Sequence, residues 1–265
     1  MTRFETLHGR ISGDGDRTVI LSHGFGTDQD AWAAIRPSLD ARFRVISYDL
    51  AGSGPDGAAS YDFDRHGSMF GFADDLLEIL DDLGIEDCIY IGHSMSGMIG
   101  AAAASARPEP FRRLIMIGAS PRYLNDEGAS YIGGFDQPDL DGLFASMAAN
   151  YQAWAAGFAP AVVGGADIAA IDEFSRTLFQ IRPDVALGMS RTIFQSDMRA
   201  VAARIESPTH IIQTNNDMAV PQDVALWLNR AIEGSTLDLI DAAGHLPHMT
   251  APGEVLRILD RRLSP

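Results

Sequence analysis

The sequence predicts an α/β fold in which a mostly parallel central sheet is covered by helices on both faces. Short apolar runs alternate with amphipathic stretches along most of the 265 residues. The apolar runs are nearly continuous, as expected for strands that are buried on both faces. Residues 122–197 differ, because they show no strand pattern and are rich in aromatic side chains. We therefore expect a core formed by residues 1–121 and 198–265, with residues 122–197 as a helical insertion packed over one end of the sheet.

The composition supports a sizeable core and excludes several classes of partner. Apolar residues make up 46% of the chain, and the formal net charge is −16. Such an acidic chain is a poor ligand for nucleic acid or for anionic lipid, because both are also negative. The sequence begins without a long apolar stretch typical of a secretory signal and has no apolar run of 18 residues, so we expect a cytoplasmic protein without membrane contact. The single cysteine, Cys88, lies in a predicted strand, and we expect it to be buried.

The individual elements follow from the apolar patterns. The strands are expected at residues 18–21, 44–48, 88–91, 114–117, 210–213 and 236–240. The core helices are expected at residues 30–39, 72–83, 95–106 and 254–263.

Three details of these helices are also expected. Asp28 or Asp30 is a suitable N-cap for the first helix, and Gly84 ends the second. The acidic pairs of the second helix, at residues 74–75 and 81–82, are expected to face solvent. In the insertion, Phe174 and Phe179 are expected to belong to its packed interior.

The strongest local motif is Gly92-His93-Ser94-Met95-Ser96-Gly97, which contains G-x-S-x-G. It lies between a predicted strand and a predicted helix, where flanking glycines permit the tight turn that exposes a serine hydroxyl. A glycine-rich connector with an ordinary serine is the simpler alternative. The strand–turn–helix context favours Ser94 as a nucleophile.

A serine nucleophile requires a base, and the base requires a carboxylate. His245 follows the last predicted strand between Gly244 and Pro247, and His248 is its competitor. We expect His8, His66 and His210 to be surface or packing residues. For the carboxylate we expect Asp217, just past the strand at residues 210–213, with Asp223 and Asp241 as rivals. The resulting chain order is Ser…Asp…His.

Hydrolysis by a serine also requires donors for the developing oxyanion. The segment His23-Gly24-Phe25-Gly26 follows an early strand, and its glycines would let the Phe25 N–H approach the reacting atoms. The second donor would be the N–H of Met95, which follows the nucleophile. No cluster of residues has the spacing of a metal site, and neither G-x-G-x-x-G nor a P-loop occurs, so we expect no metal and no cofactor.

Together, the segments HGFG, YDLAGSG, GHSMSG and AGHLPHM resemble the α/β-hydrolase superfamily. The insertion carries a narrower resemblance. Segments such as SPRYLND, NYQAW, GFAP, EFSRTLF and TIFQSDMR are similar to those of the plant strigolactone and karrikin receptor family, and to its bacterial relatives, the RsbQ-type regulators of the stress response.

This resemblance implies a four-helix cap over a deep apolar pocket and slow hydrolysis of butenolide lactones or small esters. It also implies a protein partner, which in the bacterial relatives is a PAS-domain phosphatase. Matched by motif, the residues lining the pocket would be Phe25, Tyr123, Leu143, Trp154, Phe158, Phe194 and Met218.

Two functions are therefore expected, and they are compatible with each other. The first is a serine hydrolase that cleaves a small apolar ester or lactone. The second is a signalling protein that senses a ligand in the same pocket and acts through a protein partner. A hydrolase fold kept only for binding is a third possibility, which the complete set of Ser94, Asp217 and His245 argues against.

Overall fold

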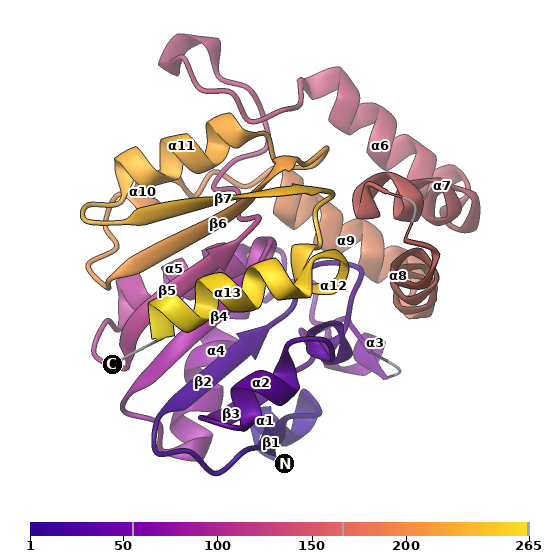
Figure 1. Ribbon diagram of the computed structural model, residues 1–265. Coiled ribbons are helices and arrows are strands. Elements are labelled where there is room, and N and C mark those ends of the chain that lie inside the picture. Colours follow the sequence, from indigo (N-terminus) through magenta and orange to yellow (C-terminus); the bar gives the residue numbers. More distant parts are fainter. Residues whose placement is uncertain (55, 166, 264–265) are drawn as a thin grey trace.

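The computed structural model describes residues 1–54, 56–165 and 167–263. Within these residues the core is a seven-stranded sheet with the order β1-β3-β2-β4-β5-β6-β7 (Figure 1). Strand β1 pairs antiparallel with β3, and the remaining neighbours are parallel. The strands are β1 Arg10–Ser12, β2 Thr18–Ser22, β3 Arg44–Tyr48, β4 Cys88–His93, β5 Phe111–Ile117, β6 Thr209–Asn216 and β7 Thr236–Ala243. The predicted fold class is confirmed, and each predicted strand lies within or close to an observed one.

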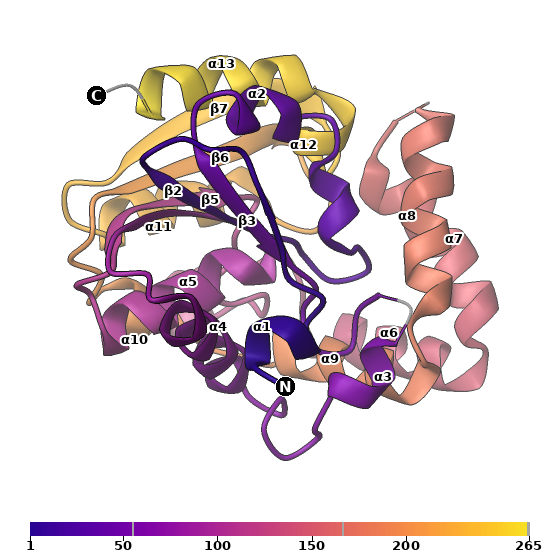
Figure 2. The same ribbon diagram turned by 90° about the horizontal axis from the view of Figure 1, so that it is seen from below.

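Both faces of the sheet are covered, which explains the continuous apolar runs. Successive side chains of a strand point to opposite faces. In β4, Ile89 and Ile91 belong to a cluster with the helices on one face, whereas Tyr90 belongs to the cluster on the other. Figure 2 shows α2 and α13 on one side of the sheet and α4, α5 and α10 on the opposite side. Cys88 is buried, as predicted.

The helices account for most of the remaining chain. The α-helices of the core are α1 Arg3–Thr6, α2 Arg36–Asp40, α3 Gly57–Ser60, α4 Met69–Leu83, α5 Met95–Ala106, α10 Arg199–Ala202, α11 Gln222–Ala231, α12 Pro247–Thr250 and α13 Pro252–Leu263. Two 3₁₀ turns, η1 Gln29–Trp32 and η2 Glu127–Ala129, complete the described elements outside the insertion's long helices. In the part of the chain that the structure describes, no helix is both long and apolar enough to cross a bilayer.

The prediction of a single helix at residues 30–39 is wrong. Residues 30–39 do not make one helix, because η1 ends at Trp32 and α2 begins only at Arg36. Pro37 in the first turn of α2 has no N–H, so it cannot continue a helix that begins before it. Asp28 is the N-cap of η1, and its carboxylate accepts from the Asp30 N–H.

A second correction concerns the acidic pairs of α4. Asp75 is buried, not solvated, and its carboxylate accepts hydrogen bonds from Arg3, Arg65 and His66. It lies on the apolar face of α4, three residues after Phe72, so helical periodicity alone places it inward. The helix ends at Gly84, as predicted, and Gly84 adopts the left-handed conformation with a φ of 61°.

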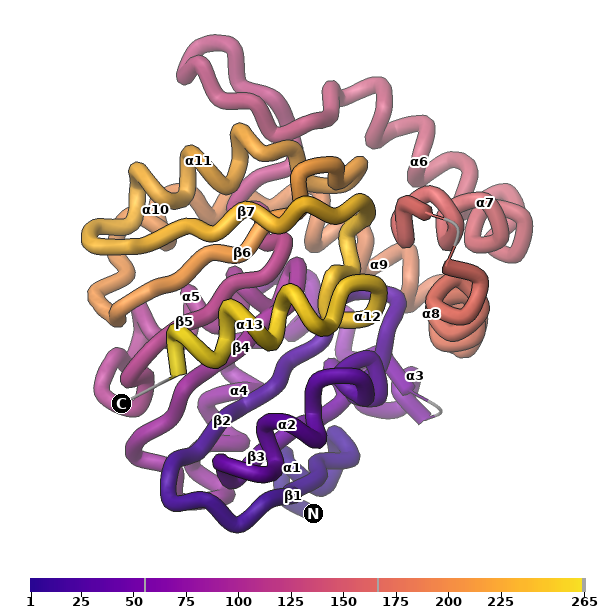
Figure 3. The backbone as a smooth tube through the Cα atoms, viewed as in Figure 1, coloured from indigo at the N-terminus to yellow at the C-terminus, as the bar shows by residue number. Residues whose placement is uncertain are grey.

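The insertion forms a cap of four long helices beside the carboxyl ends of the strands (Figure 1). These helices are α6 Gln137–Ala149, α7 Tyr151–Val163, α8 Ile168–Gln180 and α9 Pro183–Phe194. The tube in Figure 3 shows a loop that protrudes from the molecule just before α6. Arg122 and Asp197 form an antiparallel bridge, so the chain leaves and re-enters the core at adjacent points.

Candidate active site

Ser94 lies at a tight turn between β4 and α5. Its φ of 56° and ψ of −122° are unusual for a residue with a side chain. The flanking glycines are sterically required: a Cβ on Gly92 would lie 2.5 Å from the Ser96 carbonyl group, and one on Gly97 would lie 2.5 Å from the Ala119 Cβ. The motif at residues 92–97 therefore has the strained strand-to-helix geometry that presents a serine hydroxyl.

The structure brings Ser94, His245 and Asp217 into one hydrogen-bonded chain. The Ser94 Oγ lies 2.8 Å from the His245 Nε2, and the His245 Nδ1 lies 2.7 Å from an oxygen of Asp217. Because a carboxylate only accepts, the proton of the neutral imidazole belongs on Nδ1, which leaves Nε2 free to accept from the serine hydroxyl. This arrangement permits the serine to transfer its proton to the imidazole.

Asp217 is held as an anion by several donors. Burial raises the pKa of the Asp217 carboxyl, but the charge and hydrogen bond of His245 and the donors nearby outweigh burial, so the pKa lies below its usual value. The donors are the N–H groups of Ala219 and Val220 and the side-chain amide of Gln213. The carboxylate can therefore orient His245 at neutral pH.

The rival residues take no part in this hydrogen-bonded chain. Both ring nitrogens of His248 are buried without a hydrogen-bond partner among the described residues, and burial lowers the pKa of His248 to about 3. Asp223 lies in α11 and Asp241 in β7, where Asn215 donates to it.

The three histidines expected to be surface or packing residues have other partners or positions. His8 pairs with Asp49 near the surface, and His66 is buried against Asp75. His210 lies near the start of β6, at the opposite end of the strand from Asp217.

The predicted oxyanion donors belong to the loop after β2, which approaches Ser94, and to the first residue of α5. The His23 ring orders the first loop, because its Nδ1–H donates to the Gly24 carbonyl while its Nε2 accepts from the Leu50 N–H. A Cβ on Gly24 would lie 3.0 Å from the Ser94 Cβ, so glycine permits this close approach. Among the described residues, neither the Phe25 N–H nor the Met95 N–H donates to a protein acceptor. Both remain free for a ligand.

A small apolar cavity adjoins the Ser94 hydroxyl. Its volume is about 30 Å³, and it is lined by Phe25, Ser94, Tyr123, Phe158, Val162, Phe174, Ile193, Phe194, Ala219 and His245. Burial raises the pKa of the Tyr123 phenol, so this lining carries no phenolate at neutral pH. Small-molecule sites commonly hold about 300–1,000 Å³. The deep pocket implied by the resemblance is therefore a narrow cavity in this structure.

Four of the seven predicted lining residues border this cavity, and three do not. Among the described residues, its lining omits Leu143, Trp154 and Met218. Trp154 lies behind the lining and stacks on Phe158 with 4.7 Å between ring centroids. The Met218 side chain is 49% exposed, and Leu143 packs against the buried core from α6.

Four lining residues were missed: Val162, Phe174, Ile193 and Ala219. Two of them have a signal in the sequence. Val162 is one helical turn after Phe158, and Ile193 precedes Phe194. Phe174 was expected only in the packed interior of the insertion, whereas it is both buried and part of the lining. Phe179, expected in the same interior, is 45% exposed.

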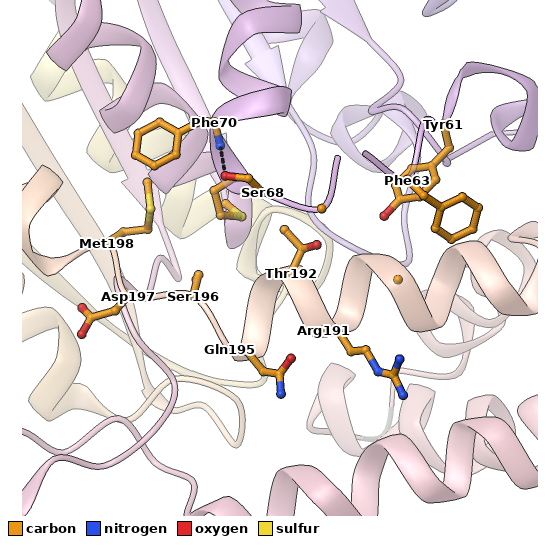
Figure 4. A pocket seen from close by; sticks show the side chains of 13 residues that line it. Tyr61, Phe63, Ser68, Phe70, Arg191, Thr192, Gln195, Ser196, Asp197 and Met198 are labelled. Atoms are coloured by element: carbon orange, nitrogen blue, oxygen red, sulfur yellow. Dashed lines mark hydrogen bonds between the residues drawn. The ribbon is translucent and has the colours of Figure 1, made fainter. Parts of the chain in front are cut away.

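A larger depression lies elsewhere on the surface. It has a volume of about 440 Å³ between α9 and the segment that leads into α4, and Figure 4 shows Tyr61, Phe63, Arg191 and Gln195 around it. Ser94, His245 and Asp217 do not line it. Although this depression is larger than the cavity at Ser94, it is therefore not the site of the chemistry of Ser94. No group of three or more His, Cys, Asp or Glu side chains within residues 1–54, 56–165 and 167–263 is arranged to hold a metal ion.

Comparisons with known proteins identify the fold family. Residues 17–252 match the family described as alpha/beta hydrolase fold. The chain is 47% identical over 260 residues to strigolactone esterase D14 of Arabidopsis thaliana, covering 98% of this chain and 97% of that protein. It is 46% identical over 257 residues to karrikin insensitive 2 receptor IA of Petunia hybrida, covering 96% of this chain and 93% of that protein.

A solved structure is similar along nearly the whole chain. The hydrolase olei00960 of Oleispira antarctica superposes with a TM-score of 0.94 at 34% identity, covering 98% of this chain and 95% of that one. The chain therefore belongs to the α/β-hydrolase fold family and, within it, resembles the strigolactone esterases and karrikin receptors of plants.

Proposed function

We propose that this protein is a serine hydrolase acting on ester bonds, and that it cleaves small, uncharged esters or butenolide-type lactones. The observation that carries the proposal is the continuous chain from the Ser94 Oγ through His245 to Asp217, which opens on an apolar cavity. The similarity to strigolactone esterase D14 supports the same reaction class.

The reaction begins with attack of the Ser94 Oγ on the carbonyl carbon, while His245 Nε2 takes the hydroxyl proton. The N–H groups of Phe25 and Met95 stabilise the tetrahedral oxyanion. As the carbonyl re-forms, the bond to the leaving oxygen breaks and His245 donates the proton to that oxygen. A water molecule, activated by the same histidine, then attacks the acyl group and releases Ser94.

The cavity lining selects the substrate. Tyr123, Phe158, Phe174 and Phe194 bring aromatic surface to the reacting atoms. Burying a carboxylate there without a cationic partner is costly, so anionic esters are disfavoured. The small volume disfavours long acyl chains.

The test is turnover of an aryl acetate and of a fluorogenic butenolide by the wild type and by Ser94→Ala. We expect the variant to lose at least about 10⁴-fold in kcat, because the nucleophile is absent. Ser105→Ala, on the same helix, is the matched control and keeps its activity. A serine-directed phosphonate should label Ser94 alone. Full activity in Ser94→Ala, or label on another serine, contradicts the proposal.

The second candidate function is ligand sensing through a protein partner, and the similarity to a karrikin receptor favours it. A PAS-domain phosphatase is the class of partner to test. A sensor turns over slowly and binds such a partner only after ligand addition, so binding should follow ligand addition in the wild type. Many rapid turnovers on the butenolide, with no ligand-dependent binding, favour the enzyme alone.

A further inference from the structure

The cavity at Ser94 is too small for the reaction that we propose. A volume of about 30 Å³ holds about two water molecules. Helix α7 contributes Phe158 and Val162 to its lining, and α9 contributes Ile193 and Phe194. An ester can therefore reach Ser94 only if the cap side chains, or the helices that carry them, move outward.

The end of α7 also contacts the backbone of the proposed base. The His245 N–H donates to the Val162 carbonyl oxygen at 2.8 Å. Val162 lies in the last turn of α7, where carbonyl groups lack partners within the helix. The cap thus supplies the acceptor for the backbone of His245.

Two glycines allow this contact. A Cβ on Gly244 would lie 1.8 Å from the Val163 carbonyl oxygen, and a Cβ on Gly164 would lie 2.4 Å from the Gly244 Cα. The two backbones therefore touch without side chains between them. We call the Val162–His245 hydrogen bond and the Gly164–Gly244 contact the α7 latch.

The other bonds of this loop come from the core. The Thr214 hydroxyl donates to the Gly244 carbonyl at 2.8 Å, and the Gly244 N–H donates to Asn216 at 2.8 Å. His93 Nε2 donates to the His245 carbonyl at 2.8 Å. The loop is therefore held between the fixed sheet and the cap.

We infer that the α7 latch positions His245, so that the position of the cap controls whether His245 can accept the proton of Ser94. Displacing α7 removes the acceptor of the His245 N–H and the surface against which the loop rests. A misplacement of about 1 Å at a catalytic group can cost about 100-fold in rate. Chemistry is then confined to the state in which the end of α7 rests against Gly244 while the side chains that line the cavity have moved aside for the substrate. This inference rests on the proposed function, and Gly164 and Val162 act in it as positioning residues.

The test is Gly164→Ala, whose Cβ pushes α7 away from Gly244. Gly164 has a φ of 71°, so alanine there also introduces backbone strain. Gly234→Ala controls for the strain, because Gly234 has a φ of 68° and nothing within 4 Å of its Cβ position. Gly165→Ala controls for the location, since its Cβ position also has no atom within 4 Å.

We expect kcat and the rate of phosphonate labelling of Ser94 to fall at least about tenfold in Gly164→Ala. Both controls should stay within about twofold of the wild type, although Gly234→Ala should lose as much thermal stability as Gly164→Ala. Gly164→Asn should behave like Gly164→Ala, because asparagine tolerates the left-handed region but carries a Cβ. Activity of both Gly164 variants equal to that of Gly234→Ala overturns the latch.

A measurement on the wild type keeps the test decisive if the variants do not fold. The chain has 7 histidines, so selective ¹⁵N-histidine labelling isolates a few backbone amides. We expect the His245 amide to be protected from hydrogen exchange, and exchange at the intrinsic rate overturns the latch. Retained activity in Ser94→Ala would instead refute the proposed function, so the two failures are distinguishable.

Discussion

The Nε2 atom of His93 lies 2.8 Å from the carbonyl oxygen of His245. The residue that precedes Ser94 is thus hydrogen-bonded to the loop that carries the proposed base. Burial lowers the pKa of His93 well below its usual value, and the neighbouring His248 and His245 lower it further, so His93 is a neutral donor. This bond links the two loops that must stay in register for proton transfer.

Replacing His93 by phenylalanine should therefore weaken both the fold and the reaction. The ring centroids of His93 and His248 are 4.4 Å apart, and phenylalanine keeps a ring in this place. It leaves the buried His245 carbonyl without its donor. We expect a loss of about 1–3 kcal/mol in the free energy of unfolding, measured by urea denaturation. We also expect kcat to fall more than KM changes. Glutamine, whose amide can donate, should recover part of the rate; equal rates for His93→Phe and the wild type would contradict this role.

Asp217→Asn tests the proposed carboxylate against its rival. The amide can no longer accept the His245 Nδ1–H as an anion does, so the imidazole loses its orientation and its stabilising charge. We expect kcat to fall by about 10⁴-fold. Asp241→Asn is the matched control, since the Asp241 carboxylate accepts from Asn215 and not from His245. Steady-state hydrolysis of an aryl acetate measures both, and a comparable loss in Asp241→Asn would undermine the assignment.

His248→Phe tests the pH dependence of stability. Burial lowers the pKa of folded His248 to about 3, whereas an unfolded histidine titrates near about 6.5. Between these pH values the unfolded chain binds a proton that the folded chain does not. Protonation therefore stabilises the unfolded state, and the free energy of unfolding falls as the pH falls from about 6.5 towards 3. Phenylalanine keeps the ring beside Trp32 and removes this titration. Urea denaturation at several pH values should show a decline shallower by up to about 1.4 kcal/mol per pH unit in the variant; identical slopes would refute the assignment.

Phe158→Ala tests how the cap limits the substrate. Phe158 lines the cavity and Trp154 stacks behind it, so removing Phe158 should open the space at Ser94 directly. We expect longer acyl esters to gain in kcat/KM relative to acetate, with attack on acetate retained. Trp154→Ala should give a smaller shift in the same direction, because it removes only the support. A panel of aryl esters of increasing chain length checks the order, and a larger effect at Trp154 would reverse this account of the lining.

Local chemistry accounts for the parts of the site that could be predicted. Ser94 lies in a motif whose glycines, within a few residues of it, have no room for a side chain. Gly84 ends a helix because its own backbone adopts the left-handed conformation. The strands are recognisable because successive residues such as Ile89 and Tyr90 are both apolar and pack on opposite faces of a sheet that is covered on both sides. These features depend on residues that are close together along the chain, so one sequence is enough to predict them.

The parts that could not be predicted depend on partners far away along the chain. Helical periodicity places Asp75 on the inner face of α4, but its burial as a charged group depends on donors that include Arg3, which is 72 residues away. Phe174 lines the cavity while Trp154 lies behind it, because packing among the cap helices sets how each helix is rotated about its axis.

By itself, therefore, the sequence determined the fold class, the tight turn at Ser94 and the residues available for proton transfer. Only the tertiary structure decided the 2.8 Å approach of His245 to Ser94, the narrow cavity and the contact between α7 and Gly244. The physical reason is that strand and helix patterns arise from local periodicity and backbone sterics. Distances between segments that are far apart along the chain depend instead on how the whole core and cap pack together.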